Sequence, residues 1–335
     1  MSAIREIKAL GFPWETQDPF LFCAYHRDEY PKGNSQFGPA ESLAGRNIGQ
    51  DFNIKDGWRM YHGSTIPGFP YHPHRGFETI TINKEGVVDH SDSLGAKGRF
   101  MAGDVQWMTA GKGVQHSEMF PLIHQDKGNP LEIFQIWLNL PKRSKFVEPH
   151  FKMLWKEEIP TIKEKDENGN EVSIDLIAGK YLDNKALEPT PDSWAAETNN
   201  NVRVMTIELA PNAKWELSTM EGTNSSLYFY KGNSIKVDIQ ELNSSTLIHL
   251  NAGEKLSIQN GDSISRLLFL EGRPINEPVV QYGPFVMNSE QEIQQAFTDY
   301  RQTEFGGWPW EEKEVSHGSE EQRFAIHGDG REERP

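Results

Sequence analysis

Apolar and polar residues alternate in short segments along much of this chain, which is the period of a half-buried β-strand. Residues 78–83 show the alternation clearly, and turn residues at 84–86 precede two valines, so we expect a β-hairpin over 78–88. The same pattern recurs later in the sequence, at residues 202–209, 226–230, 235–239, 246–250 and 265–270. Glycine and proline, with 29 and 20 residues, separate the segments. The pattern predicts an all-β sandwich or barrel in both halves of the chain.

Two polar stretches rich in turn residues interrupt the strand pattern near the middle of the chain, at 163–170 and 188–201. A length of 335 residues is sufficient for two domains, because compact domains usually have about 100–200 residues. We therefore expect an N-terminal barrel in residues 1–160 and a second barrel in residues 161–305.

A helical pattern appears near the end of the chain. Ser289 and Glu292 fit a capping box. Apolar residues then recur at helical spacing, at Ile293, Ala296, Phe297 and Tyr300. This pattern predicts an amphipathic helix that packs on a barrel, and we assign it to the second domain. Residues 306–335 are dominated by charge, so we expect a tail that is mobile or lies over the surface.

Charge and cysteine content narrow the classes of partner and site. The chain has 34 basic and 49 acidic residues, a formal charge of -15, and no basic run, so direct nucleic-acid binding is not expected. Cys23 is the only cysteine, which excludes an internal disulfide and a thiolate metal site within one chain. No apolar run is long enough to cross a membrane, and the first residues lack an export signal. The expectation is a cytoplasmic protein without membrane association.

Two pairs of residues have the spacing of metal ligands on strands. His72 and His74 form one pair, and His116 and Glu118 form the other. Because residues i and i+2 of a strand point to the same face, each pair can converge on one ion. Three imidazoles and one carboxylate suit a divalent first-row metal such as Fe, Mn, Co, Ni, Cu or Zn better than Ca or Mg. Four protein ligands in an octahedral arrangement leave two positions free for a substrate or dioxygen.

Either pair alone is more often a structural, hydrogen-bonded group than a ligand set, and it is the combination that favours a metal site. Glu78 has the parity of His72 and His74, so we expect it on the same face. Three roles are open to it, as a ligand, as a group that orients an imidazole or as a general base, and we prefer the last two. His90 is either a pocket group or a hydrogen-bonding loop residue. Arg75 is expected to form a structural ion pair, and one of the two residues at 106–107 is expected to point inward.

The segments HPHRGFET and GDVQWMTAGKGVQHSEM together resemble the signature of the pirin family, a branch of the cupin superfamily. Residues 51–63, 129–141 and 282–288 extend the resemblance over nearly the whole chain. The resemblance implies a bicupin, with two antiparallel jelly-roll β-barrels and a C-terminal helix. It also implies an iron in the N-terminal barrel, held by the residues that match the family's ligands, at His72, His74, His116 and Glu118. Glu78 would then remain outside the ligand set.

The second half of the chain offers no matching ligands. If the Lys-Gly turn at 231–232 is the counterpart of the turn at 85–86, then Ser218, Met220 and Asn224 occupy the positions of His72, His74 and Glu78. The second barrel is therefore expected to bind no metal and to have a structural role, with an independent surface for partners as the open alternative.

The resemblance implies a quercetin 2,3-dioxygenase type of activity, in which a flavonol or a similar enol is cleaved with O2. The metal would act as a Lewis acid, with Glu118 as the first candidate for the base and Glu78 as the second. An unrelated polyphenol or enol as natural substrate is an open alternative. Another alternative, also implied by the resemblance, is a redox-responsive regulatory protein that acts through protein partners, as a transcriptional co-regulator or an enzyme modulator.

Overall fold

The computed structural model describes residues 2–335, which form two compact units. The first barrel unit contains Ala24–Lys156 and Glu277–Pro335. The second barrel unit contains Glu157–Asn276 and the described residues up to Cys23. Each unit is built from antiparallel strands, so the all-β prediction is confirmed. Each unit also includes residues from one end of the chain, so neither unit is one continuous stretch of sequence.

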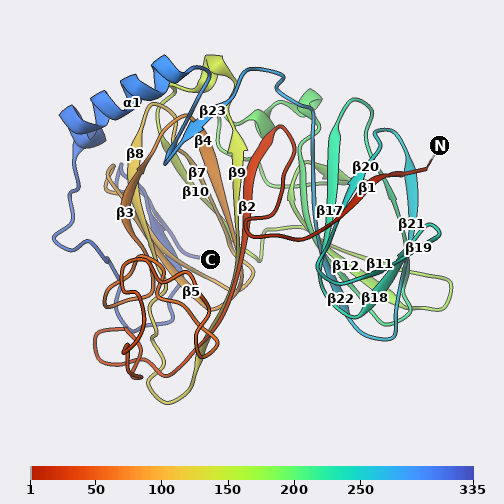
Figure 1. Ribbon diagram of the computed structural model, residues 1–335, viewed down its shortest axis with the longest axis horizontal. Coiled ribbons are helices and arrows are strands. Elements are labelled where there is room, and N and C mark those ends of the chain that lie inside the picture. The colour runs from red at the N-terminus through yellow and green to blue at the C-terminus, as the bar shows by residue number, and fades with distance from the viewer. Residues whose placement is uncertain (1) are drawn as a thin grey trace. The chain divides into compact units, whose positions relative to one another are not determined.

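Two sheets form the first barrel unit. The five-stranded sheet has the order β10 (His150–Leu154), β7 (Val105–Thr109), β4 (Phe77–Glu85), β9 (Asn129–Asn139), β2 (Phe20–Tyr30). The six-stranded sheet has the order β26 (Glu332–Glu333), β25 (Phe324–Ile326), β6 (Lys97–Met101), β5 (Val87–Asp92), β8 (Val114–Met119), β3 (Gly68–His74). In Figure 1, β3 and β8 lie on one side of this unit and β4, β7 and β9 lie on the other. The two sheets therefore enclose an interior.

The second barrel unit also has two main sheets. The seven-stranded sheet has the order β1 (Ile4–Ala9), β20 (Thr246–Leu250), β17 (Asn224–Lys231), β22 (Ser265–Gly272), β15 (Arg203–Leu209), β12 (Glu171–Ala178), β11 (Thr161–Lys165). The four-stranded sheet has the order β16 (Lys214–Ser218), β21 (Lys255–Asn260), β18 (Ser234–Val237), β19 (Gln240–Asn243), and a short pair joins β13 (Lys180–Tyr181) to β14 (Asn184–Lys185). In β21, buried and exposed residues alternate, as expected for a strand with one face on the core.

Strand β4 departs from the expected pattern, because all its residues from Phe77 to Asn83 are buried. The alternation read from the sequence is present, but the polar face is not in water. Thr81 and Asn83 point into the barrel, where Thr81 Oγ1 donates a hydrogen bond to a buried carboxylate and Asn83 Nδ2 donates to the carbonyl of Phe100. The isoleucines at 80 and 82 point the other way. The prediction of a half-buried strand was therefore wrong, and the alternation instead marks a polar barrel interior.

The predicted helix is α1 (Glu290–Thr303). Ser289 Oγ accepts a hydrogen bond from the backbone N–H of Glu292, which is one half of a capping box. Ile293 and Ala296 are buried in a cluster with Phe285 of β24 (Phe285–Met287), which pairs with β23 (Val280–Tyr282). We expected the helix to belong with the second barrel. It is instead part of the first barrel unit, because its apolar face packs on a strand of that unit.

Residues 306–335 lie on the first barrel unit with defined contacts. Strand β25 pairs with β6, and Trp310 Nε1 donates a hydrogen bond to the carbonyl of Asp92. The carboxylate of Glu314 accepts hydrogen bonds from three consecutive backbone N–H groups, of Ser64, Thr65 and Ile66. The tail was expected to be mobile or to lie over the surface, and these contacts correspond to the second arrangement. Among residues 2–335, no helix is long and apolar enough to cross a membrane.

Candidate metal centre

Strands β3 and β8 bring the two predicted pairs of residues together. The strands are antiparallel, and His72 lies directly opposite His116 in their register. Residues in such positions lie close enough for their side chains to meet. His74 follows on the same face of β3, and the nitrogen donors of His72, His74 and His116 all lie within 4.8 Å of one another. The spacing of the histidines thus produces a compact cluster inside the first barrel unit.

Backbone carbonyls fix two of the rings. Nδ1 of His72 lies 2.9 Å from the carbonyl oxygen of Pro70, and Nδ1 of His74 lies 3.3 Å from that of Pro284. Since a carbonyl can only accept, each Nδ1 carries the proton, and Nε2 of the neutral ring keeps its lone pair. The two Nε2 atoms are 3.1 Å apart. Two lone pairs at this distance repel each other unless a cation lies between them and the third ring, so the arrangement fits a metal ion.

The environment of His116 is a second, independent observation that fits a metal ion at this site. Its side chain is fully buried, and neither ring nitrogen has a hydrogen-bond partner among residues 2–335. A buried polar group without a partner costs about 1–3 kcal/mol. Burial lowers the pKa of His72 to about 4 and holds the pKa values of His74 and His116 well below the ordinary value. The three rings are therefore neutral near pH 7, which is the form that binds metals.

Glu118 lies on the same face of β8 as His116 but is not one of the three residues whose donor atoms cluster. Its Oε1 accepts a hydrogen bond from Thr81 Oγ1 (2.8 Å), and its Oε2 accepts one from Gln135 Nε2 (2.5 Å). Burial raises the pKa of this carboxyl group, while the two hydrogen bonds act in the opposite direction. Of the four predicted ligands, the structure brings three together and holds the fourth against β4 and β9.

Glu78 faces away from the cluster, contrary to expectation. Its Oε1 accepts hydrogen bonds from Thr109 Oγ1 (2.7 Å) and Trp107 Nε1 (3.3 Å), both on β7. Thr81, which has the opposite parity on β4, is the residue that points into the barrel. The parity argument failed because Gly76, with a φ of +85°, turns the chain between β3 and β4 and sends the two strands into different sheets.

His90 lies beside the cluster, with its ring centroid 5.6 Å from that of His116. Gln106 Nε2 is 3.2 Å from Nδ1 of His90, and Nε2 of His90 is 3.3 Å from the Asp92 carboxylate. Both nitrogens are therefore in hydrogen bonds, as in the second of the two roles considered, but His90 lies on strand β5 and not in a loop. Gln106 is the inward-pointing residue of the pair at 106–107. Arg75 forms the expected ion pair, at 2.7 Å from the Asp299 carboxylate on α1.

Three groups that hold the site were not predicted: Thr81, Gln135 and Pro284. Gln135 carried a usable signal, because it is a polar residue within the apolar run of β9. Thr81 was read as part of a water-facing strand. The carbonyl of Pro284 left no signal, since it comes from a segment about 200 residues away in the sequence and its role depends on the fold. In the second barrel unit, the absence of a metal at Ser218, Met220 and Asn224 stays a prediction.

Comparisons with known proteins agree with this architecture. The family model for pirin matches residues 7–138, and the model for the pirin C-terminal cupin domain matches residues 204–306. A pirin-like protein of Solanum lycopersicum is 38% identical over 237 residues, which cover 70% of this chain and 75% of the relative. Pirin-1 of Arabidopsis thaliana is 38% identical over 250 residues, covering 72% and 80%.

A solved structure of a similar protein extends the comparison to nearly the full length. The crystal structure of a quercetin 2,3-dioxygenase from Acinetobacter baumannii matches with a TM-score of 0.71 and 29% sequence identity. The match covers 92% of this chain and 99% of that protein. The two barrel units are thus of the cupin type, and the bicupin prediction is confirmed.

Proposed function

Because the chain belongs to the pirin family of the cupin superfamily and gathers three neutral imidazoles in its first barrel, we propose that it is an iron-binding dioxygenase. The proposed reaction is of the quercetin 2,3-dioxygenase type, the cleavage of a flavonol or a similar enol with O2. The observation that carries the proposal is His116, whose two ring nitrogens are buried without a partner beside Nε2 of His72 and His74. The similar enzyme from Acinetobacter baumannii supports the substrate class.

The proposed ligand set is His72, His74 and His116, with Glu118 as the fourth ligand. The three imidazoles would accept Fe, and the same donors suit other divalent transition metals. A bound metal ion would supply Lewis acidity, which lowers the pKa of a coordinated enol hydroxyl. Pro70 and Pro284 fix the rings in the tautomer that presents Nε2, so two of the ligands need no reorientation.

Glu118 is the proposed acceptor of the substrate proton. Its burial raises its pKa, which makes the carboxylate a stronger base than an exposed one. Thr81 and Gln135 each hold one carboxylate oxygen, so release of either hydrogen bond frees an oxygen for the proton without loss of orientation. Glu78 is not proposed as a base, because its carboxylate faces Trp107 and Thr109 on the other side of the sheet.

Aromatic side chains around the cluster suit a flat polyphenol. The ring of His74 lies 5.0 Å from that of Phe77 and 5.4 Å from that of Trp137, measured between centroids. The ring of Phe69 lies 6.3 Å from that of His72 on the other side. Such walls exclude water and favour planar apolar ligands. With a charge of -15, the protein is a poor partner for nucleic acid, and we propose a polyphenol and O2 as its partners.

The test combines elemental analysis of the purified protein with oxygen uptake on quercetin. We expect about one iron per chain and oxygen consumption that depends on it. His116→Ala should lose both, because one of three imidazole donors is removed. His150→Ala is the matched control, since His150 is an exposed histidine on β10 outside the cluster, and it should retain both. Oxygen uptake by metal-free protein, or full uptake by His116→Ala, would refute the proposal.

The regulatory alternative has one structural observation in its favour. His74 is hydrogen-bonded to Pro284, which precedes the strand that packs against α1, so a change at the metal has a direct route to the surface of that helix. A pull-down with the reduced and the oxidised protein tests it. A partner that binds only one oxidation state, together with no oxygen uptake on any flavonol, would favour regulation over catalysis.

A further inference from the structure

A cavity lies in the first barrel unit, apart from the histidine cluster. It has a volume of about 440 Å³, within the range of small-molecule sites. The last residue of β4, Glu85, lines it, whereas the first residue of that strand, Phe77, contacts His74. Because a strand rises about 3.3 Å per residue, these two ends are roughly 25 Å apart. None of the clustered histidines lines the cavity.

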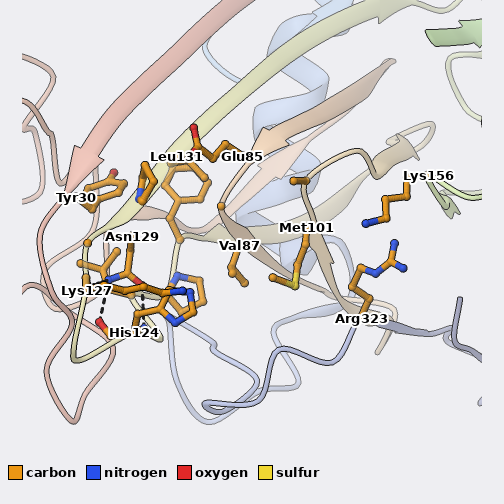
Figure 2. Close-up of a pocket in the computed structure, with 17 residues that line it drawn as sticks. Tyr30, Glu85, Val87, Met101, His124, Lys127, Asn129, Leu131, Lys156 and Arg323 are labelled. Carbon is orange, nitrogen blue, oxygen red and sulfur yellow. Dashed lines mark hydrogen bonds between the residues drawn. The ribbon is translucent and has the colours of Figure 1, made fainter. Parts of the chain in front are cut away.

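The floor of the cavity is apolar, and a lysine lies at each of its two ends. Figure 2 shows Val87 and Met101 between one group formed by Lys156 and Arg323 and another formed by His124 and Lys127. Apolar atoms on the floor favour a ligand with an apolar body. Cationic groups at both ends favour acidic groups on that body. In a chain with a net charge of -15, such a concentration of positive charge is a local exception.

The buried carboxylate of Asp104 positions Arg323 and Lys156 at one end of the cavity. Oδ1 of Asp104, which has no exposed surface, accepts a hydrogen bond from Arg323 Nη1 (2.7 Å) and one from the backbone N–H of Lys156 (3.1 Å). Oδ2 accepts one from the backbone N–H of Met101. Asp104 thereby neutralises Arg323 and fixes the backbone of Lys156. The ammonium group of Lys156 has no acidic partner among residues 2–335, so it is available to a ligand.

The buried side-chain amide of Asn129 positions His124 and Lys127 at the other end of the cavity. Oδ1 of Asn129 accepts a hydrogen bond from the backbone N–H of His124 (2.8 Å). Its Nδ2 donates to the carbonyl of His124 (3.0 Å) and to that of Lys127 (3.4 Å), contacts that Figure 2 also shows. The loop that carries His124 and Lys127 is thus held by one side chain. In the described part of the chain, the ammonium of Lys127 likewise has no acidic partner.

Among the described residues, one acidic side chain lines the cavity, and it is ion-paired to an arginine that also contacts Glu29 and Glu132. Glu85 forms an ion pair with Arg27, which lies outside the cavity lining. A ligand would therefore meet two ammonium groups that have no acidic partner in the described chain, one ion-paired carboxylate, and a histidine whose Nδ1 lies 3.5 Å from the Glu321 carboxylate. Such a cavity selects small anions over cations and neutral molecules.

We propose that this cavity binds a small organic carboxylate with an apolar body, with Lys156 and Lys127 as the residues that recognise the acidic groups. The site is independent of the proposed oxygenase activity, because it shares no residue with the histidine cluster. Arg323 comes from residues 307–335, so one wall of the site lies outside the parts of the chain that the two family models match.

Isothermal titration of the full-length, metal-loaded protein tests the proposal with benzoate, terephthalate and the neutral benzamide as probes. We expect saturable one-to-one binding of the two carboxylates, at least about tenfold weaker binding of benzamide, and weaker carboxylate binding at higher salt. Lys156→Met and Lys127→Met should each weaken terephthalate binding about fivefold, as expected for charge pairs that stay partly hydrated. Lys165→Met, at an exposed lysine on β11 of the second barrel unit, is the matched control and should bind like the wild type.

Removal of the metal with a chelator separates the two sites. Carboxylate binding that persists in the metal-free protein supports the cavity, whereas loss of binding on chelation assigns the probes to the metal centre and overturns the proposal. The absence of saturable binding, or equal binding by wild type and both lysine variants, would also overturn it. Both variants change exposed side chains, and their thermal midpoints should match that of the wild type.

Discussion

Nζ of Lys145 lies 3.1 Å from the carbonyl oxygen of Val286, so a lysine of the first barrel holds a segment 141 residues later in the chain. The same ammonium donates to the carbonyl of Gly76 (2.8 Å) and to Asn139 Oδ1 (2.9 Å), and the side chain is 1% exposed. These contacts fasten the C-terminal segment beside the turn that joins β3 to β4.

Replacement of this lysine should destabilise the first barrel unit. Lys145→Met keeps the length of the side chain but leaves three buried acceptors without their donor, and each such loss costs about 1–3 kcal/mol before relaxation. We expect the free energy of unfolding to fall by roughly 2–4 kcal/mol. Urea unfolding followed by tryptophan fluorescence measures it. Lys165→Met should change it by less than about 0.5 kcal/mol, and an equal change in both variants would contradict the assigned role.

Acid should destabilise the protein through His26, which is buried in the first barrel unit with Nδ1 2.9 Å from the hydroxyl of Tyr61. Burial lowers the pKa of His26 to about 3, whereas an unfolded histidine has a pKa near 6.5. Between these values the unfolded chain binds one more proton than the folded chain. The contribution of the neutral His26 ring to the stability of the folded chain is therefore complete above about pH 6.5. It declines as the pH falls, by up to roughly 1.4 kcal/mol per pH unit.

The comparison of wild type with His26→Gln isolates this contribution. Urea unfolding at pH 5, 6, 7 and 8, with a chelator present throughout, gives the difference in unfolding free energy between the two proteins. That difference should shrink as the pH is lowered below 6.5. A difference that stays constant over this range would show that His26 does not titrate in the predicted way.

Gln135 should act on catalysis through Glu118. Its hydrogen bond stabilises the ionised carboxylate, so Gln135→Leu should raise the pKa of Glu118 and move the acid limb of the kcat/KM profile to higher pH. We expect activity on quercetin near neutral pH to fall about tenfold while the metal content is kept. Gln125→Leu, at an exposed glutamine, is the control. Loss of the metal in Gln135→Leu would instead indicate a purely structural role.

The carboxylate of Glu314 should control how firmly the tail lies on the barrel. Glu314→Ala removes the acceptor of the backbone N–H groups of Ser64, Thr65 and Ile66, at 2.6, 2.9 and 2.9 Å. Hydrogen–deuterium exchange at these three amides should accelerate at least about tenfold, because hydrogen bonds to a charged acceptor are among the stronger ones. Glu311→Ala should leave their exchange unchanged. Unaltered exchange in Glu314→Ala would mean that other tail contacts protect these amides.

Local spacing was sufficient to predict the strands and the three histidines that meet, because both follow from the two-residue period of a β-strand. The helix was also predictable, since capping residues and apolar spacing lie within one short segment. Which barrel the helix joins was not predictable, because that depends on the contact of Ile293 and Ala296 with Phe285, a tertiary contact.

The errors at the site have a common physical cause. Alternation along β4 was correctly recognised, but the sequence cannot say whether its polar face meets water or a polar barrel interior. The parity of Glu78 was extended across Gly76, where the chain changes sheets. Thr81 and Gln135 were missed for the same reason, since polar groups line the barrel interior beside Glu118, whereas an apolar cluster that includes Val88, Phe100 and Ile133 fills another part of the unit.

The grouping of residues 277–335 with the first barrel unit has a consequence for biosynthesis. A ribosome makes the chain from the N-terminus, and domains generally fold as their residues emerge. The second barrel unit has all its residues once position 276 has emerged, whereas the first still lacks the carbonyl that orients His74 and the strand bound by Lys145. The barrel encoded first is therefore finished last, and the proposed metal site is complete only after Pro284 has emerged from the ribosome.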